Sequence, residues 1–347
     1  MKNLLFGLLS IFIVSVMVLG DCTQKASAAS EGESIEPIAL SYSAPGPATV
    51  FQSKLMQRMF DDITSMSNGK ITIKTYYGGA LLAPGATYDG ILTGVADIGY
   101  DQPSYSKGRF PIIEIMEQPW GYPDVIAANE ISWSVFEKFQ PAELKDSIIL
   151  GIYSFGHPVL ITNKPIRTLE DLAPLKIRGT GNMALMIKSL GAAPVAMPIM
   201  EVYDALHKGT VDGCLVGPEC IPNFNLYEVG KYATDVSFIG PNMVGLLFMS
   251  KKRYNRLPPQ VQQILNSQAE KYKAIVNEEL EAYTLSSYDF AREHGMEIIT
   301  VDPQEQARWK EKMQQLTTKV IADKEAKGIP AEEIASYIQN SIKDYEK

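Results

Sequence analysis

A four-position pattern that occurs twice, 115 residues apart, constrains the fold of this chain more than any other feature. The two copies are Tyr88-Asp89, Gly94 and Asp97, and, at the same spacing, Tyr203-Asp204, Gly209 and Asp212. Each copy predicts a short helix that ends at the glycine, because glycine readily adopts the left-handed conformation that follows a helix. The interval is far longer than the periods of solenoid repeats. The pattern therefore predicts two lobes of similar construction.

The segments around the repeat indicate that each lobe combines helices with a sheet. An apolar run follows each copy, at 95–100 and at 211–216, and both runs read as strands. The sequence before the first copy predicts a strand–helix–strand unit. It consists of an apolar strand over 37–42, a segment of helical spacing over 49–67 and an alternating strand over 70–76. Such units are typical of α/β folds with mostly parallel sheets.

The 347 residues are enough for two lobes, each with its own core. We expect 37–150 to form the first part of lobe I, 151–238 to form lobe II, and 239–347 to return to lobe I. The last segment contains a helical pattern over about 260–293. At about 1.5 Å per residue this helix would be ~50 Å long, enough to lie across both lobes. A strand over 296–301 and helices over 303–327 and 330–345 complete the expected order.

The N-terminus predicts export. Residues 1–3 provide a positive charge and 4–19 an almost uninterrupted apolar run, as in a secretory signal peptide. Ala26-Ser27-Ala28 predicts a signal peptide of 1–28, whereas Cys22 would fit a lipoprotein attachment site, and the sequence leaves both open. No later stretch reaches the ~18 uninterrupted apolar residues of a membrane-spanning helix.

The composition disfavours several classes of function. With 32 Lys and Arg against 40 Asp and Glu, the net charge of −8 argues against nucleic acid as a main partner. No local sequence motif supports a catalytic pair of His157 with Cys214 or Cys220. The spacing and number of these three residues also do not fit a zinc site. We therefore expect no catalytic residue, no metal and no cofactor. The two cysteines could form a disulfide or remain two buried thiols.

The region around Arg178 predicts a binding site. A strand over 175–177 delivers Arg178 to its carboxyl end, and 179–182 then turn into a helix over about 183–189. Thr168 and Asp171 form a variant of the capping box that opens a preceding short helix. Ligands of open α/β sheets bind outside the carboxyl ends of the strands. An arginine there matches a carboxylate with its planar fork.

Several motifs in a fixed order carry a family resemblance. In the first half they are Gly69-Lys70-Ile71, Gly78-Gly79-Ala80-Leu81 and Gly94-Val95-Ala96-Asp97-Ile98-Gly99. In the second half they are Leu169-Glu170-Asp171-Leu172, Leu175-Lys176-Ile177-Arg178, Gly191-Ala192-Ala193-Pro194-Val195, Glu201-Val202-Tyr203-Asp204-Ala205-Leu206 and Gly209-Thr210-Val211-Asp212-Gly213. Over about 37–294 the chain resembles the solute-binding receptors of tripartite ATP-independent periplasmic (TRAP) transporters, of the dicarboxylate-receptor (DctP) type.

The resemblance implies a two-lobed periplasmic binding protein, soluble or lipid-anchored through Cys22, rather than an enzyme. Its cleft would close by a hinge on one small organic acid, with Arg178 in the position of the family's carboxylate-anchoring arginine. The receptor would deliver its ligand to the membrane subunits of a TRAP permease, and the polar long helix favours a monomer. A receptor of an ABC importer, an exported enzyme and a scaffold protein are the alternatives.

Three departures from the family pattern bear on the ligand. A second arginine found in many relatives is replaced here by Phe155-Gly156-His157-Pro158, and Glu-Asn-Pro is replaced by Cys214-Leu215-Val216-Gly217-Pro218-Glu219. Tyr100, Gln102, Tyr105 and Trp120 crowd the loops of lobe I, although the aromatic residues among them could equally be core.

Together these departures favour a monocarboxylate with an apolar or zwitterionic body, and Glu219 could meet an amino group. The predicted ligand-binding residues are Arg178, Gln102, Tyr100, Trp120, Phe155, His157, Gly217, Pro218, Glu219 and Asn242.

Overall fold

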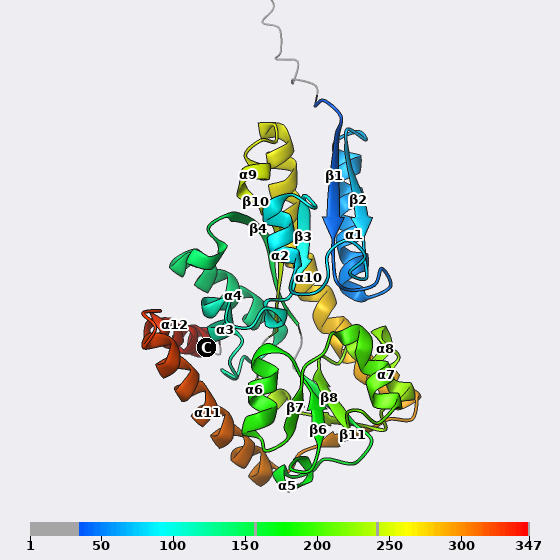
Figure 1. The fold of residues 1–347 in the computed structure, drawn as a ribbon, viewed down its shortest axis with the longest axis vertical. Helices are drawn as coiled ribbons and strands as arrows, with labels where there is room; N and C mark the ends of the chain where they lie inside the picture. Colours follow the sequence, from blue (N-terminus) through cyan, green and yellow to red (C-terminus); the bar gives the residue numbers. More distant parts are fainter. Residues whose placement is uncertain (1–34, 156–157, 241–242, 346–347) are drawn as a thin grey trace, which may run out of the picture. The chain divides into compact units, whose positions relative to one another are not determined.

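Two sheets organise the computed structural model, which describes residues 35–155, 158–240 and 243–345 (Figure 1). In order across the first sheet, the strands are β2 (Ile71–Tyr76), β1 (Ile38–Ser43), β3 (Ile98–Asp101), β10 (Met243–Ser250) and β4 (Ser147–Phe155). Across the second they are β11 (Glu297–Thr300), β9 (Tyr232–Asp235), β5 (Val159–Thr162), β8 (Gly213–Val216), β6 (Lys176–Arg178) and β7 (Ala193–Val195). Below, lobe I means the first sheet with the helices packed on it, and lobe II the second.

The α/β fold class with two sheets is confirmed, but each sheet is more mixed than the sequence indicated. β1 pairs in parallel with β2 and β3, and β6 pairs in parallel with β7 and β8. The antiparallel pairs involve β4, β5, β9 and β10. These four strands flank two of the passages between the sheets, from β4 to β5 and from β9 to β10; a third passage runs from β10 through α10 to β11. A chain that leaves a sheet and returns to it re-enters in the opposite direction, which explains the antiparallel pairs.

The sequence repeat corresponds to a repeated structural unit. The carboxylate of Asp97 accepts hydrogen bonds from the backbone N–H and the hydroxyl of Ser41 on β1, both at 2.8 Å. The carboxylate of Asp212 accepts one from the backbone N–H of Lys176 on β6, also at 2.8 Å. In each lobe the aspartate thus ties the start of one strand to its parallel neighbour. The glycines that precede them, Gly94 and Gly209, have φ values of +87° and +68°.

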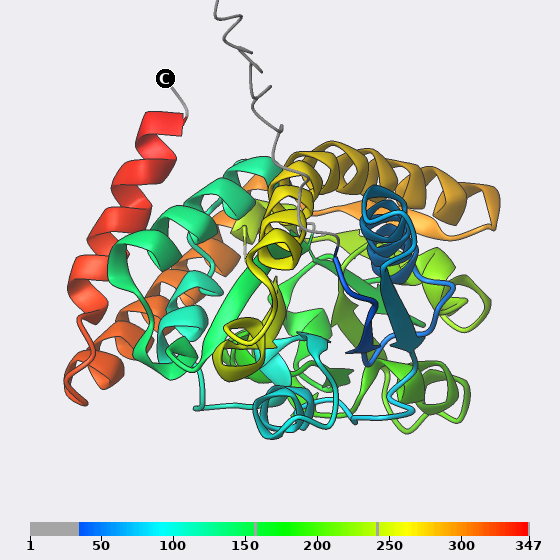
Figure 2. The same ribbon diagram turned by 90° about the horizontal axis from the view of Figure 1, so that it is seen from above.

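The longest helix contacts both lobes. α10 (Pro259–Glu293) agrees with the helix predicted over about 260–293. It packs against α1 (Phe51–Met66) and β4 in lobe I, and against α8 (Cys220–Asn223) and β11 in lobe II. The rings of Phe51 and Tyr283 stack with their centroids 4.7 Å apart where α1 meets α10. Figure 2 shows the curved course of α10 and α1 beside it.

The remaining helices cover the sheets. They are α2 (Thr87–Thr93), α3 (Pro111–Met116), α4 (Val125–Phe139), α5 (Leu169–Leu172), α6 (Gly181–Ser189), α7 (Val202–His207), α9 (Lys251–Tyr254), α11 (Pro303–Glu325) and α12 (Ala331–Tyr345). The capping box of Thr168 and Asp171 is present at the start of α5. α12 packs on α4 of lobe I, whereas α11 packs on α6 of lobe II and also reaches α3 of lobe I, where Lys324 pairs with Glu114 at 2.6 Å.

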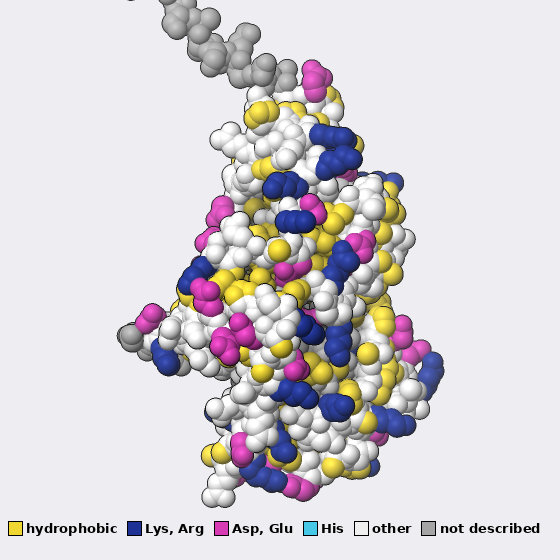
Figure 3. All heavy atoms as spheres, turned by 60° about the vertical axis from the view of Figure 1, so that its left-hand side comes forward, with side chains coloured by type: hydrophobic (Ala, Val, Ile, Leu, Met, Phe, Trp, Pro, Cys, Tyr) yellow, Lys and Arg dark blue, Asp and Glu magenta, His cyan; other side chains and the backbone are white. Residues whose placement is uncertain are grey.

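Three sequence predictions concern the signal peptide, membrane-spanning helices and the cysteines. The signal peptide with both processing sites lies outside the described residues. Within those residues, no helix combines the length and apolarity that crossing a bilayer requires. Cys214 and Cys220 are free thiols. On the face drawn in Figure 3, basic and acidic side chains are interspersed.

Candidate binding site

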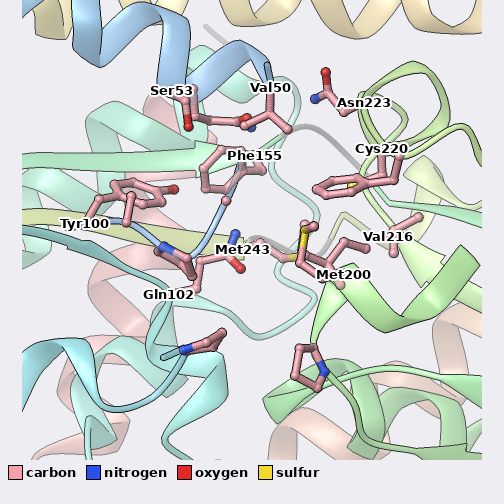
Figure 4. Close-up of a pocket in the computed structure, with 18 of the residues that line it drawn as sticks. Val50, Ser53, Tyr100, Gln102, Phe155, Met200, Val216, Cys220, Asn223 and Met243 are labelled. Carbon is pink, nitrogen blue, oxygen red and sulfur yellow. The ribbon is translucent and has the colours of Figure 1, made fainter. Parts of the chain in front are cut away.

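A pocket lies where the two lobes meet, and both lobes and the crossing strands contribute side chains to it. It encloses about 840 Å³, counted out to its open mouth. Figure 4 shows Tyr100 and Gln102 of lobe I facing Met200, Val216 and Cys220 of lobe II. Phe155 and Met243, the residues at the crossing ends of β4 and β10, lie between them and are register partners in the first sheet.

The repeated unit explains the position of the pocket. In lobe I the parallel strands β1 and β3 end at Ser43 and Asp101, and the residues just after them, Ala44 and Gln102, line the pocket. In lobe II the parallel strand β6 ends at Arg178, which lines the pocket itself. The carboxyl ends of equivalent strands thus face each other, which is where ligands of open α/β sheets bind.

Arg178 is buried and held by its own lobe. Only 5% of it is exposed. Its Nε and Nη2 donate hydrogen bonds to the backbone carbonyl of Met197 at 3.0 and 2.8 Å. Within the described residues no carboxylate forms an ion pair with it. Two of the five guanidinium N–H groups are used by Met197, and the Tyr105 hydroxyl is a further hydrogen-bonding neighbour of the guanidinium. The remaining N–H groups are available to an anion in the pocket.

The turn after β3 closes the pocket beside Arg178. This turn, Pro103–Tyr105, meets the start of α6: the hydroxyls of Ser104 and Thr180 lie 3.5 Å apart. The Tyr105 hydroxyl accepts a hydrogen bond from the backbone N–H of Ile199 at 3.4 Å. Gly181 has a φ of +50°, and a Cβ there would lie 2.9 Å from the backbone of Ser104. Glycine is required at this close approach of the lobes.

Glu219 is the second charged group of the pocket. It is 2% exposed, and its Oε2 has no hydrogen-bond partner among the described residues. The Cys220 thiol lies at the limit of contact, 4.0 Å from Oε1. Burial raises the pKa of the Glu219 carboxyl to about 7. A Cβ at Gly217 would lie 2.2 Å from Oε1, so the missing side chain there provides the space for this carboxylate.

Aromatic and aliphatic side chains make up much of the remaining wall. The rings of Tyr100 and Phe155 meet edge to face with centroids 6.4 Å apart. Val216 and Met243 continue the apolar surface. The site therefore combines one permanent cation, one acid that titrates near neutral pH, and an apolar body.

The structure brings together five of the ten predicted ligand-binding residues. Arg178, Gln102, Tyr100, Phe155 and Glu219 all line the pocket. Gly217 and Pro218 do not line it, although Gly217 makes room for Glu219 as described above. His157 and Asn242 lie outside the described residues.

Trp120 lies elsewhere. Its indole N–H donates to the carbonyl of Ile115 at 2.7 Å, and the ring lines a separate hollow with side chains of α11 and α12. The indole thus has its own backbone partner close in sequence, and we do not retain Trp120 as a pocket residue.

Sequence reasoning missed part of the wall. Tyr42, Met200 and Asn223 line the pocket, as do residues of 44–53 in the loop after β1 and the first turn of α1. The segment 44–53 could have been found, because it follows a strand whose carboxyl end the repeat predicts to face the cleft. No pattern points to Met200 or Asn223. Within the described ranges, no three His, Cys, Asp or Glu side chains are grouped so as to hold a metal ion.

We expect the unliganded protein to lose stability as the pH rises from 5 to 8. Burial raises the pKa of Asp101 and of Glu219 to about 7 and that of Glu117 to about 8. The unfolded chain releases these protons near pH 4, so the native state binds more protons between pH 4 and 8. Stability is then lost as the pH rises through the folded pKa values, by about 1.4 kcal/mol per pKa unit for each group.

Urea denaturation followed by circular dichroism at pH 5.5 and 8.0 measures this loss. The Glu219→Gln variant should lose less stability over the same interval. A denaturation midpoint that stays constant or rises with pH would contradict the assignment of these three carboxyls.

Comparisons with known proteins agree with this geometry. The model of the family described as "Bacterial extracellular solute-binding protein, family 7" matches residues 42–324. A solute-binding protein of Albidiferax ferrireducens is 26% identical over 217 residues, which are 60% of this chain and 63% of that protein.

Two solved structures share the fold. A TRAP periplasmic solute-binding protein of Desulfovibrio salexigens, in an open complex, has the C-terminus of a symmetry mate in its ligand-binding site. It is 28% identical, with a TM-score of 0.77 over 89% of this chain and 97% of that one. A TRAP solute-binding protein of Rhodoferax ferrireducens, in complex with copurified benzoate, is 25% identical, with a TM-score of 0.83 over 89% and 98%. The family resemblance predicted from the sequence motifs is confirmed.

Proposed function

Because the chain belongs to family 7 of the bacterial extracellular solute-binding proteins, we propose that it is the receptor of a TRAP transporter for a small monocarboxylate with an apolar body. The observation that carries this proposal is Arg178. It is buried in the pocket, fixed by the carbonyl of Met197, and free of any ion pair with the described carboxylates. A bound carboxylate supplies the anion that this guanidinium otherwise lacks.

A ligand with one carboxylate fits the charges of the pocket better than one with two. Arg178 is the one basic side chain among the described residues that line it, and Glu219 would repel a second carboxylate. The apolar wall of Tyr100, Phe155 and Val216 suits a hydrocarbon or aromatic body. The benzoate bound by the Rhodoferax relative is a molecule of this kind, and a peptide C-terminus in the Desulfovibrio relative also carries a carboxylate.

The same geometry supports capture by closure. The chain leaves lobe I at Phe155 and re-enters it at Met243, and these residues pair in adjacent strands. Two neighbouring crossings act as one hinge about which the lobes turn. A ligand that touches Arg178 of lobe II and Tyr100 of lobe I stabilises the closed state, because the open state lacks one set of contacts.

The proposal extends to the finer points of the role. We place the receptor in the periplasm, either free or anchored through Cys22, as a monomer that binds its ligand without converting it. It passes the closed complex to the membrane subunits of a TRAP permease. Service to an ABC importer is the alternative, and the permease genes encoded next to this one distinguish the two.

A thermal-shift screen of the mature protein tests the proposal. The panel contains aliphatic and aromatic monocarboxylates, dicarboxylates and sugar acids, with the methyl ester of each monocarboxylate as its control. A monocarboxylate at about 100 times its Kd should add about 2.7 kcal/mol of stability and raise Tm by several degrees, while its ester should not. If no carboxylate raises Tm, or if the esters act as well as the acids, the proposal is wrong. Recovery of the bound acid unchanged separates a receptor from an enzyme.

A further inference from the structure

The proposed function uses Arg178 and the apolar wall but leaves Glu219 without a role. This carboxylate lines the pocket, is 98% buried, and has one oxygen with no partner among the described residues. A buried carboxylate without a partner costs stability, and a group that pairs with it recovers that cost. Its position in the pocket indicates that this group belongs to the ligand.

The local backbone keeps the Glu219 carboxylate in this position. Glu219 directly precedes the short helix α8, and its Oε1 lies over Gly217, where any side chain would displace it. Gly217 and the thiol of Cys220 lie next to the carboxylate and carry no charge that would neutralise it, while its own backbone N–H favours the charged form. No described basic side chain forms an ion pair with it, and Arg178 also lies beyond ion-pair distance.

We propose that Glu219 is a specificity-determining residue that binds a cationic amine, so that the preferred ligand is a zwitterion with an ammonium group as well as a carboxylate. This inference rests on the proposed function, because Arg178 supplies the other pole. A zwitterion neutralises both buried charges at once, whereas a simple monocarboxylate leaves Glu219 unpaired. Arg178 and Glu219 do not form an ion pair with each other. Arg178 is therefore available to the ligand carboxylate and Glu219 to the ligand ammonium group.

The titration of Glu219 provides a second signature of this pairing. An ammonium group binds the ionised carboxylate, so affinity for a zwitterion should rise between pH 5.5 and 8.0 through the pKa of about 7. Affinity for an amine-free carboxylate should fall over the same range, because ionised Glu219 repels it. Burial raises the pKa values of the neighbouring titratable groups, which therefore stay uncharged; they are Tyr100 on β3, Cys220 on α8, and Tyr283 and Tyr288 on α10.

Calorimetric titration with matched pairs of ligands tests the proposal. The pairs are L-phenylalanine with 3-phenylpropanoate, 5-aminopentanoate with pentanoate, and 4-(aminomethyl)benzoate with 4-methylbenzoate, so that the ammonium stands at different distances from the carboxylate. In at least one pair the amine-bearing member should bind the wild type about 10-fold tighter or more. Glu219→Gln should remove that preference and lower affinity for the zwitterion by ~30-fold or more, with little loss for its partner.

Glu201→Gln is the matched control, since Glu201 is an exposed glutamate of the same lobe, and it should leave both affinities unchanged. Carboxylates that bind through Arg178 with no preference for the amine in any pair would overturn the role of Glu219 and leave the proposed function intact. A pH trend that persists in Glu219→Gln would also overturn it and point to another group, with Asp101, whose pKa burial also raises to about 7, the first to test. If no carboxylate in the panel binds, the proposed function itself is wrong.

Discussion

Arg178→Ala is expected to weaken binding of the carboxylate ligand by about 30-fold or more. Removing one partner of a buried, hydrogen-bonded charge pair costs about 2–5 kcal/mol, much of it because the other charge stays buried without a partner. Arg178 fits this case, since it is 5% exposed and already fixed by Met197. Calorimetric titration with the best acid from the thermal-shift screen measures the loss.

Two further variants separate binding from folding. Arg178→Lys keeps the charge but loses the planar fork, so it should recover only part of the affinity. Arg167→Ala is the matched control, because Arg167 is an exposed arginine of the same lobe that pairs with Glu297. It should bind like the wild type. If Arg178→Ala folds and binds within about threefold of the wild type, Arg178 is a structural residue and the anchor lies elsewhere.

Trp309→Ala is expected to destabilise the protein by about 3–5 kcal/mol, the usual cost of deleting a fully buried tryptophan side chain. Trp309 of α11 is completely buried in the core of lobe II, where its ring packs edge to face on Phe238 at 5.9 Å. Its indole N–H donates to Oε1 of Glu305 at 3.0 Å, and the same oxygen accepts from the backbone N–H of Leu169 at 2.8 Å. The substitution therefore leaves a cavity and loosens the start of α5.

Urea denaturation at pH 6 measures this effect, with Lys319→Ala as the control. Lys319 lies on the exposed side of the same helix and should change stability by less than about 0.5 kcal/mol. Equal midpoints for the two variants would show that α11 is not part of the cooperative unit of lobe II.

The two-lobed α/β fold could be predicted from the repeated Tyr-Asp, Gly, Asp pattern, because its residues serve both a local turn and the pairing of neighbouring strands. The glycines end helices, and the aspartates bind the neighbouring parallel strand, as Asp97 binds Ser41 and Asp212 binds Lys176. A second copy of the pattern therefore indicates a second copy of the same strand–helix arrangement. The antiparallel insertion of β10 between β3 and β4 carries no such signal, because an apolar run of this kind fits either strand direction.

The two charged residues of the pocket, Arg178 and Glu219, could be predicted from the sequence, whereas most of the other residues that line it could not. Arg178 follows a short strand at the position where α/β sheets bind ligands, and Glu219 follows the equivalent of a second such strand. Met200 and Asn223 reach the pocket through turns whose course depends on packing. Trp120 shows the opposite error: an aromatic residue near a cleft was expected to line it, whereas a hydrogen bond to Ile115 gives it another position.

The strand order has a consequence for the way in which the chain is made. β10 is the strand that joins β4 to the rest of the first sheet, and β11 reaches the edge of the second only after α10 has been synthesised. A nascent chain that stops short of Met243 thus holds fragments of both sheets and completes neither. Pairing of such distant segments is slow. For the exported protein that the N-terminal sequence predicts, slow folding is an advantage, because an export channel that carries unfolded chains can accept only a polypeptide that has not yet folded.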